Sequence, residues 1–251
     1  MEPLFVSLAF YILVIGLCEL SRQVVTQFSQ EGSLWRRFLI EMLGTVQVCT
    51  CVYENGLITK HYGLLGFFLA VCTLLLVHGM VNRGAFVNPA GNFENLYYGR
   101  ISGQVFGACL AGELVGGYLA FRMAKRVWWL GLSIDHVTQY ANFPCKLQHK
   151  VRYLNVCLYE IICCFIIRYF VGMVRPDRKR YAIAVSIAFF LTLAIALIGV
   201  PGLNPIIASA RMMNCEGLSH AYFLLTYWLC PIVGHMSAAV LQERMNKAKT
   251  A

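Results

Sequence analysis

Asn88-Pro89-Ala90 and Asn204-Pro205-Ile206 are the two stretches of sequence that decide the fold of this chain. Asn is favoured immediately before a helix, and Pro at the first helical position removes no intrahelical hydrogen bond. Each stretch therefore predicts a helix start, although a single Asn-Pro pair is only a common turn signal. The segments that follow, 88–98 and 204–214, are too short to cross a bilayer, which takes about 20 apolar residues. Their length suits half-helices that enter the membrane and return.

The rest of the chain is apolar enough to use lipid as its solvent. Hydrophobic residues make up 59% of the 251 residues and charged residues 13%, whereas soluble domains carry about 25% charged residues. Helices satisfy their own backbone hydrogen bonds in lipid, so we predict an all-α membrane protein. Seven stretches are long and apolar enough to be spans: 4–27, 35–53, 62–81, 101–122, 151–174, 181–199 and 218–241.

Charge and cysteine content exclude several other classes of protein. The net charge of +9 does not indicate a nucleic-acid partner, because the cations stand in short loops between apolar spans, as in the positive-inside bias of membrane proteins. Most of the eleven cysteines fall within apolar stretches, where they serve as small core residues. No Cys/His array has metal-ligand spacing, and no paired acid, activated nucleophile or P-loop is visible. We expect no metal site, no cofactor and no enzyme activity.

An internal repeat organises the spans. Glu41 stands 47 residues before Asn88, and Glu160 stands 44 residues before Asn204. Each unit contains three spans, so the second unit is inverted relative to the first, and the two Asn-Pro loops approach each other from opposite faces. The chain then divides into an N-terminal apolar helix, a first repeat, a connecting loop, an inverted second repeat and a C-terminal tail: 1–34, 35–122, 123–150, 151–241 and 242–251. The first helix lacks the basic start of a signal peptide, and it either spans the membrane or lies against the bundle.

The asparagines and the intramembrane glutamates have different expected roles. Two half-helix N-termini that face each other concentrate partial positive charge, and the amides of Asn88 and Asn204 offer donors to a passing oxygen, which favours water and disfavours cations. A buried glutamate in a membrane invites a proton-relay interpretation. The alternative is that Glu41 and Glu160 accept backbone donors from the neighbouring loop and hold it, and we favour it because no further titratable residues accompany them. Glu113 has no counterpart and no assigned role beyond facing a cavity or a helix.

These features resemble the aquaporin family over nearly the whole chain. The run Arg83-Gly84-Ala85-Phe86-Val87-Asn88-Pro89-Ala90 is similar to the family's first signature loop, Gln104 resembles its third-span glutamine, and Tyr227-Trp228-Leu229-Cys230-Pro231 resembles its last-span motif. The departures resemble the unorthodox or superaquaporin branch, because Ile206 replaces the usual Ala and Cys215 has the spacing of that branch's signature cysteine. The resemblance implies six transmembrane helices, two re-entrant half-helices and an extra N-terminal apolar helix. It also implies homotetramers in an intracellular membrane, such as that of the endoplasmic reticulum.

The resemblance further implies a constriction at four positions counted from the two asparagines: Phe68, Thr192, Pro201 and Ile207. Thr192 and Ile207 replace the histidine and the arginine that the family has there, which leaves a largely apolar opening. Glycerol and hydrogen peroxide then join water as expected solutes. Arg211 lies two helical turns past Asn204, and we interpret it as a cation at the membrane edge.

Two cysteines in connecting regions are candidates for a disulfide. The inverted topology places Cys145 and Cys215 on the same non-cytosolic side, where an oxidising lumen permits a bond between them. A packed free thiol is the alternative, because geometry decides whether two cysteines can pair.

We therefore expect a passive channel for water and small neutral solutes in a lipid bilayer. A secondary carrier is one rival, since carriers also use inverted repeats and broken helices, but the breaks here offer no ion-coordinating groups apart from the asparagines. A membrane scaffold of the same fold is the other, with a closed pore whose apolar ring at Pro201 and Ile207 excludes water.

Overall fold

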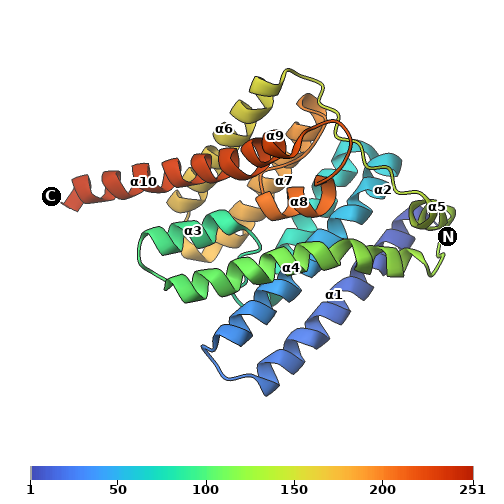
Figure 1. The fold of residues 1–251 in the computed structure, drawn as a ribbon, viewed down its shortest axis with the longest axis horizontal. Helices are drawn as coiled ribbons and strands as arrows, with labels where there is room; N and C mark the ends of the chain where they lie inside the picture. Colours follow the sequence, from blue (N-terminus) through green and yellow to red (C-terminus); the bar gives the residue numbers. More distant parts are fainter. Residues whose placement is uncertain (1, 251) are drawn as a thin grey trace.

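The computed structural model describes residues 2–250, and their side chains as far as residue 248. Within that range the regular structure is helical, apart from one isolated bridge between Lys146 and Glu216. The chain order is α1 (Pro3–Phe28), α2 (Leu34–Val81), α3 (Pro89–Tyr97), α4 (Gly103–Trp128), α5 (Ile134–Ala141), α6 (Tyr153–Met173), η1 (Pro176–Arg178), α7 (Lys179–Leu197), α8 (Pro205–Met212), α9 (His220–Leu224), η2 (Leu225–Leu229) and α10 (Cys230–Thr250) (Figure 1). The prediction of an all-α membrane protein is confirmed.

Helix α2 holds two of the seven predicted spans. Its 48 residues correspond to about 72 Å, far more than the hydrocarbon core of a bilayer. The helix breaks at Gly63, whose φ of 64° and ψ of −160° are readily adopted by glycine. Its second half folds back along the first, since the imidazole of His78 lies 3.5 Å from where a side chain on Gly44 would begin. The seven stretches therefore form six long helices, and the residues between the predicted spans 35–53 and 62–81 are helical.

Helix α1 runs antiparallel to the first half of α2. The Ser7 hydroxyl donates to Glu54 at 2.6 Å near one end, and Arg22 Nη2 donates to the Gln47 side-chain oxygen at 2.6 Å toward the other. Its 26 residues are about 39 Å long, which is enough to cross a membrane. The N-terminal helix is therefore long enough to span, and it packs against the bundle.

The two half-helices, α3 and α8, extend along α4 in opposite directions (Figure 1). The ring centroids of Phe93 on α3 and Phe106 near the start of α4 are 4.9 Å apart. Ile206 at the start of α8 and Ala210 one turn later come to 3.3 and 3.7 Å from where a side chain on Gly117 of α4 would begin. The two half-helices therefore start near the middle of α4, where their N-terminal ends come together.

The last span is one continuous helical run with a π-helical turn at η2. Pro231 has no backbone N–H for the carbonyl four residues earlier, at Tyr227, and the wider turn absorbs this irregularity. Helix α10 continues as far as Thr250, so the predicted tail, 242–251, is helical where the structure describes it. Ala251 lies outside the described residues.

Candidate functional site

The tips of the two half-helices are joined by the side chain of Asn204. Its Nδ2 donates to the carbonyl oxygen of Val87 at 2.7 Å, immediately before Asn88. Its Oδ1 accepts from the backbone N–H groups of Ile206 at 2.9 Å and Ile207 at 3.3 Å, which caps the start of α8. Asn204 therefore caps its own helix and links the two re-entrant loops.

Asn88 is bonded differently, although it occupies the equivalent position. Its Oδ1 accepts from the backbone N–H of Ala90 at 3.1 Å and caps α3. Its side-chain nitrogen donates no hydrogen bond within the described part of the chain, and the residue is only half-buried. The amide donors of Asn88 are thus unused within the described residues. The other members of the two motifs are buried, namely Pro89, Ala90, Pro205 and Ile206.

Glu41 holds the first re-entrant loop through its backbone. One carboxylate oxygen accepts from the N–H of Phe86 at 2.8 Å, and the other accepts from the N–H of Val87 at 3.1 Å. Val87 has a φ of 54°, which a β-branched residue adopts only when its surroundings hold it there. The carboxylate supplies that restraint directly, because it bonds the strained residue itself.

Glu160 holds the second re-entrant loop with a single bond. Its Oε2 accepts from the N–H of Leu203 at 2.7 Å, and Leu203 also has a positive φ, 66°. Gly202 sits so close to this carboxylate and to the ring of Tyr227 that any side chain there would overlap them. Glu41 and Glu160 thus accept backbone donors from the neighbouring loops, which is the alternative that we favoured over a proton relay.

Glu113 joins the first half-helix to α4. The residue is fully buried, and its Oε1 accepts from Asn92 Nδ2 at 3.1 Å. Asn92 lies on α3, four residues past Asn88 and one helical turn from the tip. The unmatched glutamate of the first repeat therefore makes a helix contact, one of the two roles considered for it, and its partner is α3.

A second link to α3 was missed altogether by the sequence analysis. Glu94 on α3 accepts from Arg168 of α6 at 2.6 and 2.7 Å, and His235 Nε2 of α10 lies 2.9 Å from the same carboxylate. This bidentate pair ties the first half-helix to the second repeat. The available signal was the presence of opposite charges within membrane segments, which are costly unless they are paired.

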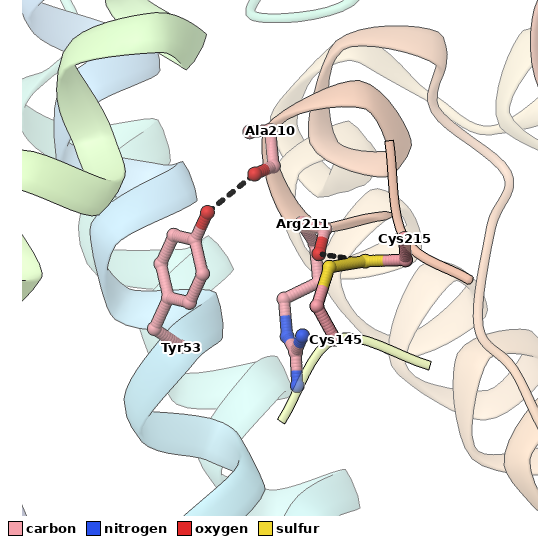
Figure 2. Close-up of a disulfide and its surroundings, with 5 residues drawn as sticks. All are labelled: Tyr53, Cys145, Ala210, Arg211 and Cys215. Carbon is pink, nitrogen blue, oxygen red and sulfur yellow. Dashed lines mark hydrogen bonds between the residues drawn. A yellow bond between two sulfur atoms is a disulfide. The ribbon is translucent and has the colours of Figure 1, made fainter. Parts of the chain in front are cut away.

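The end of α8 is fixed by a disulfide between Cys145 and Cys215, so the free-thiol alternative does not hold (Figure 2). The bond closes a separation of 70 residues. Two backbone hydrogen bonds lie beside it, from Leu147 N to Glu216 O at 2.8 Å and from Glu216 N to Cys145 O at 3.2 Å. The connecting loop is therefore held against the segment that follows the second half-helix.

Arg211, which we interpreted as a cation at the membrane edge, is half-buried beside this disulfide (Figure 2). Its guanidinium carbon lies 4.4 Å from the ring centroid of Phe143 and 5.6 Å from that of Tyr53. Contacts of this kind stabilise a cation over an aromatic face. The Tyr53 hydroxyl donates to the carbonyl of Ala210. Cys215 Sγ only contacts the Arg211 carbonyl, at 3.8 Å, because a disulfide sulfur has no proton to donate.

The four predicted constriction residues are all half-buried. Phe68 packs on a cluster of residues from α2 and α7 that includes Ala188, and the hydroxyl of Thr192 donates to the Ala188 carbonyl at 2.7 Å. Ile207 packs on a different cluster, with Tyr53 among its members. Pro201 stands at the entry to the second loop. Phe68 and Thr192 thus share Ala188 as a neighbour, whereas Ile207 packs on a different cluster.

Gln104 and His149 are two other polar residues, and they differ in their contacts. Gln104 is exposed in the first turn of α4 and makes no hydrogen bond among the described residues, so its structural role stays a prediction from resemblance. His149 Nε2 lies 2.8 Å from the hydroxyl of Tyr227, and burial lowers the pKa of His149. The His149 imidazole therefore faces the tyrosine that borders Gly202.

Comparisons with known proteins identify relatives of the chain by sequence and by fold. No protein-family model matches the chain. The chain is 34% identical to a Caenorhabditis elegans protein that carries the name aquaporin-10, over 98% of this chain and 89% of that one. It is 27% identical to the aquaporin-11 of Equus caballus, over 93% and 87% of the two chains. The solved aquaglyceroporin of Plasmodium falciparum is similar in fold, with a TM-score of 0.59 and 16% identity over 82% of this chain and 94% of that one.

Proposed function

Because the chain belongs to the aquaporin family, in its superaquaporin-like branch, we propose that it is a passive channel for water and small neutral solutes. The observation that carries this proposal is the unequal use of two equivalent asparagines. The side-chain nitrogen of Asn204 donates to the carbonyl of Val87. The side-chain nitrogen of Asn88, the next residue along the chain, donates no hydrogen bond within the described residues. Two capped helix N-termini add partial positive charge there, which suits a neutral solute that offers an oxygen atom and opposes a cation.

The proposed constriction widens the range of solutes beyond water. Thr192 and Ile207 stand where the family resemblance implies a histidine and an arginine, so the ring formed with Phe68 and Pro201 has no fixed charge. An apolar ring removes the donors that would hold water in preference to larger solutes. We propose glycerol and hydrogen peroxide as solutes together with water, and the fold neighbour named an aquaglyceroporin supports the choice of glycerol.

Stopped-flow permeability of the purified protein in liposomes tests this function. We expect water, glycerol and hydrogen peroxide to cross faster than in protein-free liposomes, and in proportion to the amount of folded protein. Negligible permeability to all three solutes would favour the closed scaffold. Uphill solute uptake driven by a proton gradient would favour the carrier.

Thr192→Val tests the constriction itself. The Thr192 hydroxyl donates within its own helix, to Ala188, so an isosteric change removes a polar group with little effect on folding. We expect the ratio of glycerol to water permeability to rise about two- to tenfold, because one lost hydrogen bond changes a barrier by about 0.5–1.5 kcal/mol. Ser186→Ala is the matched control, since Ser186 makes the same bond to Ala182 on the same helix at 2.6 Å. An equal ratio of glycerol to water permeability in the two variants would show that Thr192 does not belong to the constriction.

The assembly and the compartment are proposed from the same relationship. We propose homotetramers in the membrane of the endoplasmic reticulum. The disulfide supports an oxidising compartment on the side where α8 ends. Mass measurement of the detergent-solubilised protein and co-localisation with a marker of that membrane test these two statements.

A further inference from the structure

Helix α1 precedes the inverted repeat and contributes no residue to either half-helix. The two repeats begin with the glutamate spans of α2 and α6, which carry Glu41 and Glu160, and both half-helices lie within them. Yet α1 contacts the first re-entrant loop through both a charge and an apolar side chain. These contacts indicate that the additional helix supports the loop.

The charged contact joins Glu19 of α1 to Arg83, the residue that opens the loop. Arg83 Nη2 donates to Glu19 Oε1 at 2.6 Å, and Nη1 donates to Oε2 at 3.1 Å. This is the bidentate geometry that makes arginine–carboxylate pairs directional. The two side chains are 31% and 25% exposed, so solvent weakens the pair without removing it.

The apolar contact lies closer to the C-terminal end of the same helix. Val25 packs on a cluster formed by Ile40 of α2 with Ala85 and Val87 of the loop. The same α1 therefore bonds the beginning of the loop through Glu19 and packs, through Val25, on the cluster that contains Ala85 and Val87.

The loop needs such support because its backbone is strained at both ends. Arg83 has a φ of 50° and Val87 a φ of 54°, and non-glycine residues in this region persist only where their neighbours over-determine them. The carbonyl of Val87 then accepts the bond from Asn204. A continuous set of contacts thus leads from α1 to the junction of the two half-helices.

We propose that α1 acts as a strap for the first re-entrant loop and that Glu19 is a positioning residue for the solute path. It holds Arg83, and through the loop it sets the place of the Val87 carbonyl and of Asn88. This inference rests on the proposed channel function. Loss of the strap loosens the loop and lowers permeability while the bundle stays folded.

Arg83→Gln is the variant of choice, because Glu19 also accepts from Arg22 and Gln23. Arg22 is fully buried, and its Nε donates to Glu19 at 3.1 Å, so Glu19→Gln also disturbs the packing of α1. Arg83→Gln removes the link to the loop and leaves the contact between Glu19 and Arg22 in place. Glu31→Gln is the matched control, since Glu31 is exposed in the turn after α1 and makes no ion pair within the described residues.

The experiment measures two properties of each purified variant in liposomes. One is solute permeability, and the other is amide hydrogen exchange of the segment 83–88, where the N–H groups of Phe86 and Val87 are held by Glu41. We expect Arg83→Gln to lower permeability about two- to fivefold, the range for a partly exposed ion pair, and to speed exchange of the segment. Glu31→Gln should match the unmodified protein in both properties.

The double variant separates positioning from a general structural role. If Glu19 acts on the loop through Arg83, Glu19→Gln should lower permeability no further once Arg83→Gln is present, even though thermal stability falls because of Arg22. Faster exchange with unchanged permeability, or no change in either property, would overturn the inference. If the unmodified protein fails to conduct, the proposed function fails, and the exchange measurement alone decides whether the strap exists.

Discussion

The two re-entrant loops reach the same tip geometry with different supports. The first, residues 83–88, receives two backbone bonds from Glu41 and a side-chain pair from Glu19 of α1. The second, residues 199–204, receives one backbone bond from Glu160, and the segment beyond its half-helix is held by a disulfide. An inverted repeat therefore preserves the position of a loop, while the contacts that stabilise it differ between the two halves.

The same contrast divides the two asparagines. Asn204 is a structural residue as well as a cap, because it bonds Val87 across the junction. Asn88 caps its helix and leaves its amide nitrogen free. The contacts that hold each loop and the role of each asparagine can therefore be tested by substituting matched residues in the two repeats.

Removal of the disulfide is expected to have the largest effect, and to act on the second half-helix, α8, but not on the first loop. Cys145→Ser opens a closed separation of 70 residues, which should lower the free energy of unfolding by about 2–4 kcal/mol. Thermal unfolding in mild detergent measures the loss, and hydrogen exchange should speed up in α8 but not in segment 83–88. Cys72→Ser is the control, because Cys72 is a free cysteine. An equal increase of hydrogen exchange in α8 and in segment 83–88 would show that the two half-helices are not held separately.

The two loop-holding glutamates should respond unequally to the same substitution. Glu41 uses both carboxylate oxygens, so Glu41→Gln turns an amide NH₂ toward a backbone N–H and should cost about 2–3 kcal/mol of unfolding free energy. Glu160 uses one oxygen, which the amide oxygen of Glu160→Gln can replace, at about 1 kcal/mol. The comparison is made by thermal unfolding of both variants. A larger loss from Glu160→Gln would reverse our account of the two loops.

The sequence predicted the elements of the fold well, because apolar length and helix-start residues are local properties. The Asn-Pro stretches and the glutamates before them predicted both half-helices and their opposite directions. The break in α2 was misplaced, since nothing near residue 53 marks the continuation of a helix, while Gly63 lay inside a predicted span. The disulfide was left open because pairing depends on the distance between Cα atoms, 4.8 Å here.

The supports of the half-helices could be predicted only in part. Each glutamate span carried a carboxylate that a neighbouring loop could use, so Glu41 and Glu160 were assigned a plausible task. Glu94 and Arg168 are 74 residues apart, and only the packing of α3 on the second repeat shows that they meet. The unequal roles of Asn88 and Asn204 depend on which amide donor reaches the Val87 carbonyl, and only the packing of the two loops shows that it is the one from Asn204.

Paired asparagine-to-aspartate variants test the central claim most directly, with permeability and thermal stability measured on the same samples. Both changes keep the oxygen that caps the half-helix and remove the amide donors. We predict that Asn88→Asp stays as stable as the unmodified protein but loses at least tenfold in permeability, because its free donors are replaced by an anion. Asn204→Asp should lose both, because its carboxylate meets the Val87 carbonyl at the 2.7 Å contact. Unchanged permeability in Asn88→Asp, or equal stability of the two variants, would contradict the account.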